Sequence, residues 1–166
     1  RGERDGVKKD DPVLNDSGLI GRVMSVTDST ATVITLIDSR SAVAGMVERT
    51  RDNGICHGSL YVYENDEMLR MNYLPEGSEI NTGDRVITSG LDGKYPKGIP
   101  VARVLSVAPS DYTQFMAIYA EPLVDLQHLE EVLLLEPTGI AQPEPEPEGP
   151  PPVFVGPPAP PAAVTP

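Results

Sequence analysis

Two histidines, one cysteine and a serine next to a glycine are the residues of this chain best suited to nucleophilic or acid–base chemistry. His57 directly follows Cys56, and neighbouring residues on a β-strand point to opposite faces, so a Cys–His dyad is disfavoured. His128 stands among acidic residues, which is typical of a solvated surface histidine. Ser89 precedes Gly90 without the G-x-S-x-G pattern of a nucleophile elbow, and turn formation after a strand explains it more simply. The sequence therefore predicts no catalytic residue.

Metal ions and phosphates are not favoured by the spacing of the polar residues. One cysteine and two histidines lie too far apart for a metal-ligand motif, and the acidic turn at 64–67 lacks the glycine and terminal glutamate of a calcium loop. The stretch GLDGKYPKG at 90–98 has three glycines but neither G-x-G-x-x-G nor the Lys-Ser/Thr of a phosphate-binding loop. We expect no cofactor and no metal.

Two tyrosines offer a candidate binding surface. Tyr61 and Tyr63 share one face of a predicted strand, while Leu60 and Val62 share the other. If the aliphatic pair faces the core, both tyrosines stand outside and suit a partner-binding surface. The inverted arrangement places them in the core, and periodicity alone leaves both interpretations open.

The elements that position these residues are predicted β-strands, and two of these strands are similar in sequence. GRVMSV at 21–26 returns as ARVLSV at 102–107, with polar and apolar residues alternating in both copies. Two related units in tandem predict two small β-sheets or barrels side by side. Within one strand, Leu69, Met71 and Tyr73 are expected on a shared core face. Strands are expected at 12–15, 19–26, 31–38, 41–49, 54–63, 68–74, 85–90, 100–107, 115–121 and 131–135, with a helical turn at 124–130.

Composition separates a foldable region from a tail. Of the 18 prolines, 12 lie after Glu136, so residues 137–166 are predicted to be a disordered, acidic, Pro-rich tail. Its apolar island VFV at 153–155 is either a docking peptide or part of a spacer. The formal charge is −12, and residues 12–136 alone carry 9 basic against 18 acidic side chains. Such a field repels nucleic acid, so no nucleic-acid partner is expected. The single cysteine forms no intrachain disulfide, and no apolar run is long enough for a membrane span.

The stretch GDRVITSGLDGKYPKGIPVARVLSV at 83–107 resembles the signature of the bacterial rod shape-determining protein MreC family. That signature runs from Gly-Asp through a β-branched strand, Thr-Ser-Gly-Leu, a glycine and an aromatic-Pro-x-Gly to Pro-Val. GLIGRV at 18–23 and EPLVDLQHLEEVLLL at 121–135 also follow the family's order, so the resemblance covers nearly all of 1–136 and none of the tail.

The resemblance marks a set of turn and loop residues as structural, and two positions depart from it. Asp10 and Asp92 stand where the family usually has glycine. Asp tolerates a left-handed backbone better than most residues, so both turns are expected to survive. The structural residues are Gly18, Gly83, Gly90, Gly93, Pro96, Gly98 and Pro100.

The resemblance implies an all-β fold of tandem small barrels that acts as a non-enzymatic scaffold of cell elongation and peptidoglycan synthesis. Members carry a membrane helix and a coiled coil before two barrels outside the cytoplasmic membrane, and they often form homo-oligomers. The expected division is a partial first barrel at 1–49, a six-stranded second barrel at 50–136 and the tail at 137–166. Membrane attachment is expected only through an absent upstream segment.

The same resemblance implies partners and a location. The expected partners are the elongation penicillin-binding transpeptidase, RodA, MreD and the MreB system. The expected location is the extracytoplasmic face of the bacterial cell membrane. An incomplete first barrel would leave a strand edge unpaired, which favours pairing with another chain segment.

Two alternatives stay open from the residues alone. Double β-barrels include serine proteases, so a degenerate or unusual chymotrypsin-like protease that uses His57 and Ser89 is the runner-up. A module that binds peptidoglycan directly is the third interpretation, although an acidic surface suits an anionic wall poorly.

Overall fold

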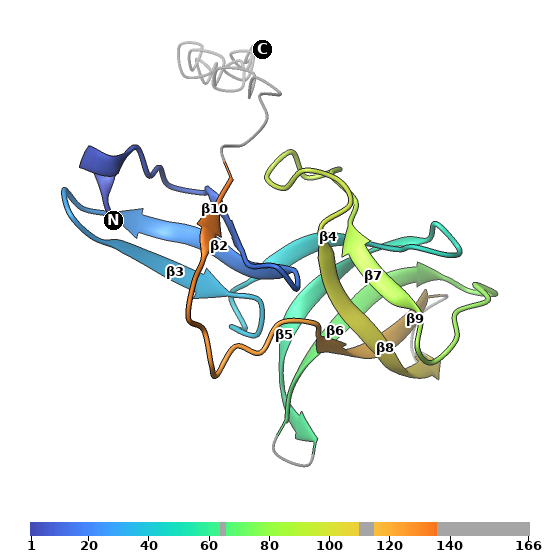
Figure 1. Ribbon diagram of the computed structural model, residues 1–166. Helices are drawn as coiled ribbons and strands as arrows, with labels where there is room; N and C mark the ends of the chain where they lie inside the picture. Colours follow the sequence, from blue (N-terminus) through green and yellow to red (C-terminus); the bar gives the residue numbers. More distant parts are fainter. Residues whose placement is uncertain (64–65, 110–114, 136–166) are drawn as a thin grey trace, which may run out of the picture.

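The computed structural model describes the backbone of residues 1–63, 66–109 and 115–135, and the side chains of 1–58, 68–108 and 115–135. Its strands form a four-stranded sheet beside a closed six-stranded barrel (Figure 1). Apart from the 3-10 turn η1 (Glu3–Asp5), the elements of these ranges are all strands, which confirms the predicted all-β class. No helix within the same ranges has the length and apolar character needed to cross a membrane.

The barrel is built from six strands in the order β4-β5-β6-β9-β8-β7, and all neighbours run antiparallel. Closing the sheet on itself leaves the barrel without a free edge. The strands are β4 (Ala42–Val47), β5 (Asn53–Tyr63), β6 (Asp66–Pro75), β7 (Arg85–Thr88), β8 (Pro100–Pro109) and β9 (Phe115–Pro122).

The barrel interior is filled by apolar side chains because apolar residues recur on one face of each strand. Met71, Leu74 and Ile118 are among the largest side chains that are 0% exposed, and they belong to one continuous cluster. Burial of a side chain of this size stabilises the fold by about 1.5–3 kcal/mol.

The second unit is an open sheet in the order β10-β1-β2-β3, with β3 and β10 at its edges. Its small core is made mainly of valines, including the fully buried Val13 and Val23. The strands are β1 (Pro12–Leu14), β2 (Leu19–Val26), β3 (Ala31–Thr35) and β10 (Leu133–Leu134).

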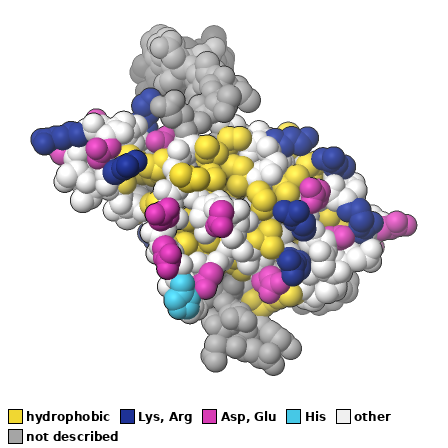
Figure 2. All heavy atoms as spheres, viewed as in Figure 1, with side chains coloured by type: hydrophobic (Ala, Val, Ile, Leu, Met, Phe, Trp, Pro, Cys, Tyr) yellow, Lys and Arg dark blue, Asp and Glu magenta, His cyan; other side chains and the backbone are white. Residues whose placement is uncertain are grey.

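Sheet and barrel share part of one core. Leu19 and Leu36, which come from the sheet segment, pack within the barrel's apolar cluster. Gly18 lies so close to the barrel that a Cβ there would stand 2.5 Å from the carbonyl oxygen of Pro100. On the face shown in Figure 2, apolar side chains gather across the middle of the molecule, with charged side chains around them.

Strand pairing differs from the predicted division in two places. Residues 42–47 were expected with the first unit, but β4 pairs with β5 and β7 inside the barrel. The closing strand was expected in the second unit, but β10 pairs with β1 of the sheet. Pairing depends on contacts distant in sequence, which strand periodicity does not encode. The division into separate units at residues 49 and 50 stays a prediction, and the tail at 137–166 lies outside the described residues.

The helical turn predicted at 124–130 is wrong. The carboxylate of Asp125 accepts the backbone N–H groups of Gln127 at 2.9 Å and His128 at 3.2 Å, which folds the segment as an Asx turn. Val124 is 3% exposed in the sheet core, where Leu126 also packs. The segment between β9 and β10 therefore crosses from barrel to sheet without a helix.

Candidate functional site

The β7–β8 loop, residues 89–99, holds most of the residues that the sequence marks as structural. Gly90 packs against the far end of the loop, since a Cβ there would lie 3.1 Å from the Cβ of Lys97. A side chain at this position is disfavoured both by that contact and by the positive φ of 77°. Gly83, Gly93 and Gly98 also have positive φ, of 93°, 66° and 97°.

Asp92 and Asp10, the two departures from the family pattern, are accommodated differently. Asp10 has a φ of 71°, which confirms that an aspartate adopts the left-handed conformation there. Asp92 instead uses its carboxylate, because Oδ1 accepts the N–H groups of Lys94 at 3.1 Å and Tyr95 at 3.3 Å. Its Oδ2 accepts the N–H of Ala44 at 3.3 Å, which ties the loop to β4.

Thr88 is the buried polar residue that closes the base of this loop. Its hydroxyl donates to the carbonyl oxygen of Pro96 and accepts the N–H of Ile99 at 2.9 Å. The Thr88 side chain is 0% exposed, so both bonds form away from water. The loop is thus a rigid connection, as its glycines and prolines predict.

Tyr95 fills the space beneath the loop. Its side chain is 2% exposed, and burial raises its pKa to about 12. The positive charge of Arg22 partly opposes this rise, while Asp92 and Asp10 add to it. Arg22 also forms an ion pair with Asp10, so a loop of the barrel meets charged residues of the sheet at this point.

The candidate protease residues do not form a catalytic set. The Ser89 hydroxyl donates to the carbonyl oxygen of Ala44 at 3.1 Å and accepts the N–H of Leu91 at 3.3 Å. A serine held in this way supports a turn and has no base to activate it. His57 lies on β5 opposite Ala42 and Arg70, with no bond to that serine.

Cys56 and His57 lie on opposite faces of β5. Cys56 points into the barrel and is 3% exposed, whereas His57 is half-buried on the other face. Burial raises the pKa of the Cys56 thiol from 9.0 to about 12, so the thiolate needed for nucleophilic attack is suppressed at neutral pH. This geometry gives no Cys–His dyad.

His128 lies on the surface beside Asp125. Its Nδ1 stands 2.8 Å from Oδ2 of Asp125, and both side chains are exposed. The side-chain hydrogen bond with His128 lowers the pKa of Asp125. Among the residues that the structure describes, no three His, Cys, Asp or Glu side chains gather as a metal-ligand set.

For the tyrosines expected to bind a partner, the structure describes the backbone alone. The backbones of Tyr61 and Tyr63 belong to β5, and Tyr63 pairs with Asp66 of β6. Their side chains lie outside the described residues. Their partner-binding role stays a prediction.

A different aromatic pair, which the sequence pattern missed, is exposed on the barrel. Tyr73 was expected in the core, but it is 58% exposed and its ring meets that of Phe115 edge to face, with centroids 6.1 Å apart. The ladder between β6 and β9 shifts register between Met71 and Leu74, so Leu74 takes the inward position instead. Tyr73 has a φ of 66°, a rare conformation for a bulky residue. The local signal was the adjacent pair of apolar residues before Pro75, which breaks strict alternation.

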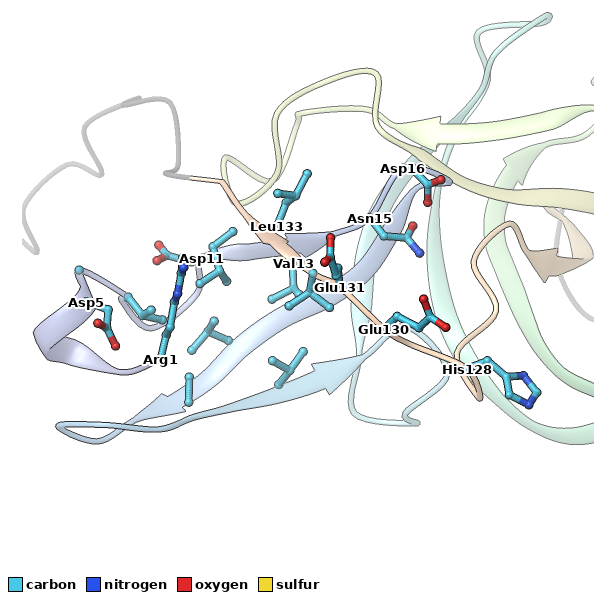
Figure 3. Close-up of a pocket in the computed structure, with 17 residues that line it drawn as sticks. Arg1, Asp5, Asp11, Val13, Asn15, Asp16, His128, Glu130, Glu131 and Leu133 are labelled. Atoms are coloured by element: carbon cyan, nitrogen blue, oxygen red, sulfur yellow. The ribbon is translucent and has the colours of Figure 1, made fainter.

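The open sheet also carries a groove of about 1190 Å³ (Figure 3). Apolar side chains such as Val13 and Val33 line it, together with Asp11, Glu130 and Glu131. Asp11 is 4% exposed, and its Oδ2 accepts the N–H of Lys8 at 2.8 Å. The lining is thus mixed, with apolar and acidic side chains beside an edge strand, and such an edge suits an extended segment of polypeptide.

The chain is similar to known proteins over most of its length. Residues 1–136 match the family described as "Rod shape-determining protein MreC, barrel core". The cell shape-determining protein MreC of Haemophilus influenzae is 34% identical over 140 residues, which cover 84% of this chain and 39% of that protein. This chain thus spans about two fifths of that relative's length.

Two solved structures are similar in fold. The crystal structure of MreC from Pseudomonas aeruginosa has a TM-score of 0.75 and 33% identity, covering 82% of this chain and 85% of that one. A complex between a penicillin-binding protein (PBP2) and MreC from Helicobacter pylori matches with a TM-score of 0.63 and 21% identity, over 77% of this chain and 78% of that one. The match at 21% identity concerns the fold alone. On its sequence match over residues 1–136 and its barrel architecture, this chain belongs to the MreC family of rod shape-determining proteins.

Proposed function

We propose that this protein acts by binding, as a non-enzymatic scaffold that positions enzymes of lateral wall synthesis and so controls cell shape. The carrying observation is the exposed pair Tyr73 and Phe115, held on a closed barrel. Aromatic residues are enriched at interface hot spots, and a rigid scaffold reduces the ordering cost of association. The backbone strain at Tyr73 supports this role, because strained residues concentrate where function requires them.

The partner that we propose is the elongation penicillin-binding transpeptidase. The support is the Helicobacter pylori complex, in which an MreC of the same fold is bound to a penicillin-binding protein. RodA, MreD and the MreB system, homo-oligomer formation and an extracytoplasmic location with an upstream membrane anchor are further parts of the proposal, and they rest on family membership.

We also infer that the open sheet is a partial barrel. Its two edge strands and its groove provide the surface on which further strands could pack. The 39% share of the Haemophilus influenzae relative leaves ample sequence in such a protein to supply them.

The test of the binding surface compares substitutions at exposed apolar positions of one barrel. The double variant Tyr73→Ser, Phe115→Ser is expected to bind the purified transpeptidase at least about 30-fold more weakly, the effect of losing one hot spot of about 2 kcal/mol. Leu105→Ser is the matched control, because Leu105 is also an exposed apolar residue of the barrel, at 36%. Affinity is measured by biolayer interferometry after far-UV circular dichroism has shown that both variants fold. Equal affinities of parent and double variant would exclude this surface.

A further inference from the structure

The β7–β8 loop is a local basic site on an acidic protein. It carries Lys94 and Lys97, two of the four lysines in a chain of formal charge −12, and both are exposed. The only acidic residue of the loop, Asp92, directs both carboxylate oxygens at backbone N–H groups. Within the described part of the chain, neither lysine forms an ion pair. The loop therefore presents two lysine ammonium groups and one carboxylate, a net positive charge, with neither lysine held in an ion pair of the described residues.

The same loop presents an apolar residue in a fixed position. Leu91 is 73% exposed, and its N–H is held by the Ser89 hydroxyl at 3.3 Å. The Cβ of Lys97 lies against Gly90, the residue that precedes Leu91. A rigid combination of one leucine and two lysines suits a ligand that alternates apolar and acidic groups.

The described chain ends beside this loop. The N–H of Leu135 donates to the carbonyl oxygen of Pro12 at 3.0 Å, which fixes the root of the tail on β1. Pro12 pairs with Arg22, and Arg22 acts electrostatically on Tyr95 within the loop. Figures 1 and 3 both show the loop next to the point where β10 ends. The last described residue, Leu135, therefore lies near the loop that carries the two lysines.

The sequence of the tail matches the loop in charge and polarity. Residues 143–148 read PEPEPE, so Glu144, Glu146 and Glu148 alternate with prolines, and no basic residue occurs in 137–166. Such a sequence favours polyproline II, which advances about 3.1 Å per residue and is largely preordered. Glu144 is nine positions beyond Leu135, so an extended chain reaches about 28 Å from its root.

We propose that the Pro-Glu segment 143–148 of this chain binds the β7–β8 loop, with its carboxylates on Lys94 and Lys97 and its prolines over Leu91. Single exposed ion pairs are weak, but a short tether holds the segment at an effective concentration in the millimolar range. In this contact the prolines of the segment cover the exposed side chain of Leu91. It concerns a surface separate from the Tyr73 and Phe115 pair, so the two proposals fail independently.

The test uses the full chain and a zero-length carbodiimide cross-linker, which forms an amide only between a lysine amine and a carboxylate in direct contact. Mass spectrometry of the monomer band is expected to show links from Lys94 or Lys97 to Glu144, Glu146 or Glu148. The other two lysines, Lys8 and Lys9, are an internal control and are expected to form few such links. The links are expected to be lost in 1 M salt, where the Debye length falls to about 3 Å.

Two charge-matched variants decide the result. Lys94→Gln, Lys97→Gln should shift the NMR signals of the tail glutamates toward those of a free peptide, whereas Lys8→Gln, Lys9→Gln should leave them unchanged. Tail links mainly to Lys8 and Lys9, or identical tail signals in the parent and the Lys94→Gln, Lys97→Gln variant, would overturn the proposal. Links found only in a dimer band would overturn it as well and would assign the loop to the tail of a second copy.

Discussion

Tyr73 combines a strained backbone conformation with an aromatic contact that offsets part of its cost. A bulky side chain at a φ of 66° costs on the order of 1–3 kcal/mol, and the edge contact with Phe115 returns about 0.5–1.5 kcal/mol. The same backbone conformation directs the Tyr73 ring to the surface, where the residue is 58% exposed.

Tyr73→Asn separates stability from binding at this position. Asparagine adopts a left-handed backbone more readily, so the free energy of unfolding in urea is expected to stay within about 1 kcal/mol of the parent. Affinity for the transpeptidase is nevertheless expected to fall at least about tenfold. A variant that binds normally, or that loses more than about 3 kcal/mol of stability, would contradict this account.

Cys56 predicts a specific dependence of stability on pH. Its pKa is about 12 in the folded protein and 9.0 when unperturbed, so above pH 9 the unfolded chain loses a proton that the native protein keeps. The contribution of the buried Cys56 thiol to the free energy of unfolding is therefore complete below pH 9. It declines as pH rises from 9 toward 12, by about 1.4 kcal/mol per pH unit. The difference in unfolding free energy between the parent and Cys56→Ala, measured in urea at pH 8, 9 and 10, should shrink accordingly. A difference that is constant with pH would contradict the buried thiol.

Several residue-level features could be predicted from the sequence. The opposite directions of Cys56 and His57 follow from strand alternation, and the positive φ of Asp10 follows from its place in a glycine pattern. Tyr73 could not be placed, because the bulge that turns it outward arises from pairing with β9 about 40 residues away. The groove beside Asp11 is equally a product of packing between distant segments.

At the scale of elements, the β7–β8 loop depends on a single hydroxyl. Thr88→Val removes the group that donates to Pro96 and accepts from Ile99, leaving two part-buried backbone groups without this partner. Stability is expected to fall by about 1–3 kcal/mol, measured by urea unfolding. Thr88→Ser keeps the hydroxyl and should lose clearly less, and an equal or larger loss in Thr88→Ser would show that the methyl group matters at least as much as the hydrogen bonds.

Element positions were predicted better than element partners. The strand at 19–26 matches β2 and the strand at 100–107 lies within β8, because turn residues mark their ends. The placement of β4 in the barrel and of β10 in the sheet was missed, since both depend on which distant strand offers a matching edge. The helical turn at 124–130 was missed because Asp125 satisfies local N–H groups with its own side chain.

At the scale of the whole molecule, Gly18 controls the junction of sheet and barrel. A Cβ at Gly18 would stand 2.5 Å from the backbone of Pro100, a contact that only backbone movement can relieve. Gly18→Ala is expected to destabilise the protein by more than about 3 kcal/mol. Gly77→Ala is the matched control, because Gly77 also has a positive φ but has nothing within 4 Å of a Cβ, and it should cost about 1 kcal/mol. Similar losses in the two variants would argue against a tight junction.

The shared core also predicts that sheet and barrel unfold together. Leu19 and Leu36 are 0% and 1% exposed within the barrel cluster, so melting the sheet opens the barrel interior. Leu36→Ala is expected to destabilise both units by about 2–5 kcal/mol in a single urea transition. Native-state hydrogen exchange should report the same decrease in amide protection in β2 and in β9. A decrease in protection limited to β2 would contradict coupled unfolding of sheet and barrel.

The pairing of Val13 with Leu134 has a consequence for biosynthesis. All barrel strands, from β4 to β9, lie between Val13 and Leu134 in the sequence, so the barrel is an insertion within the sheet. A ribosome releases the amino-terminal strands first, yet they gain their last neighbour only after every barrel strand has left the exit tunnel. The sheet therefore stays incomplete while the barrel strands are translated. Its last strand pairing, between β10 and β1, forms after the barrel strands have been synthesised.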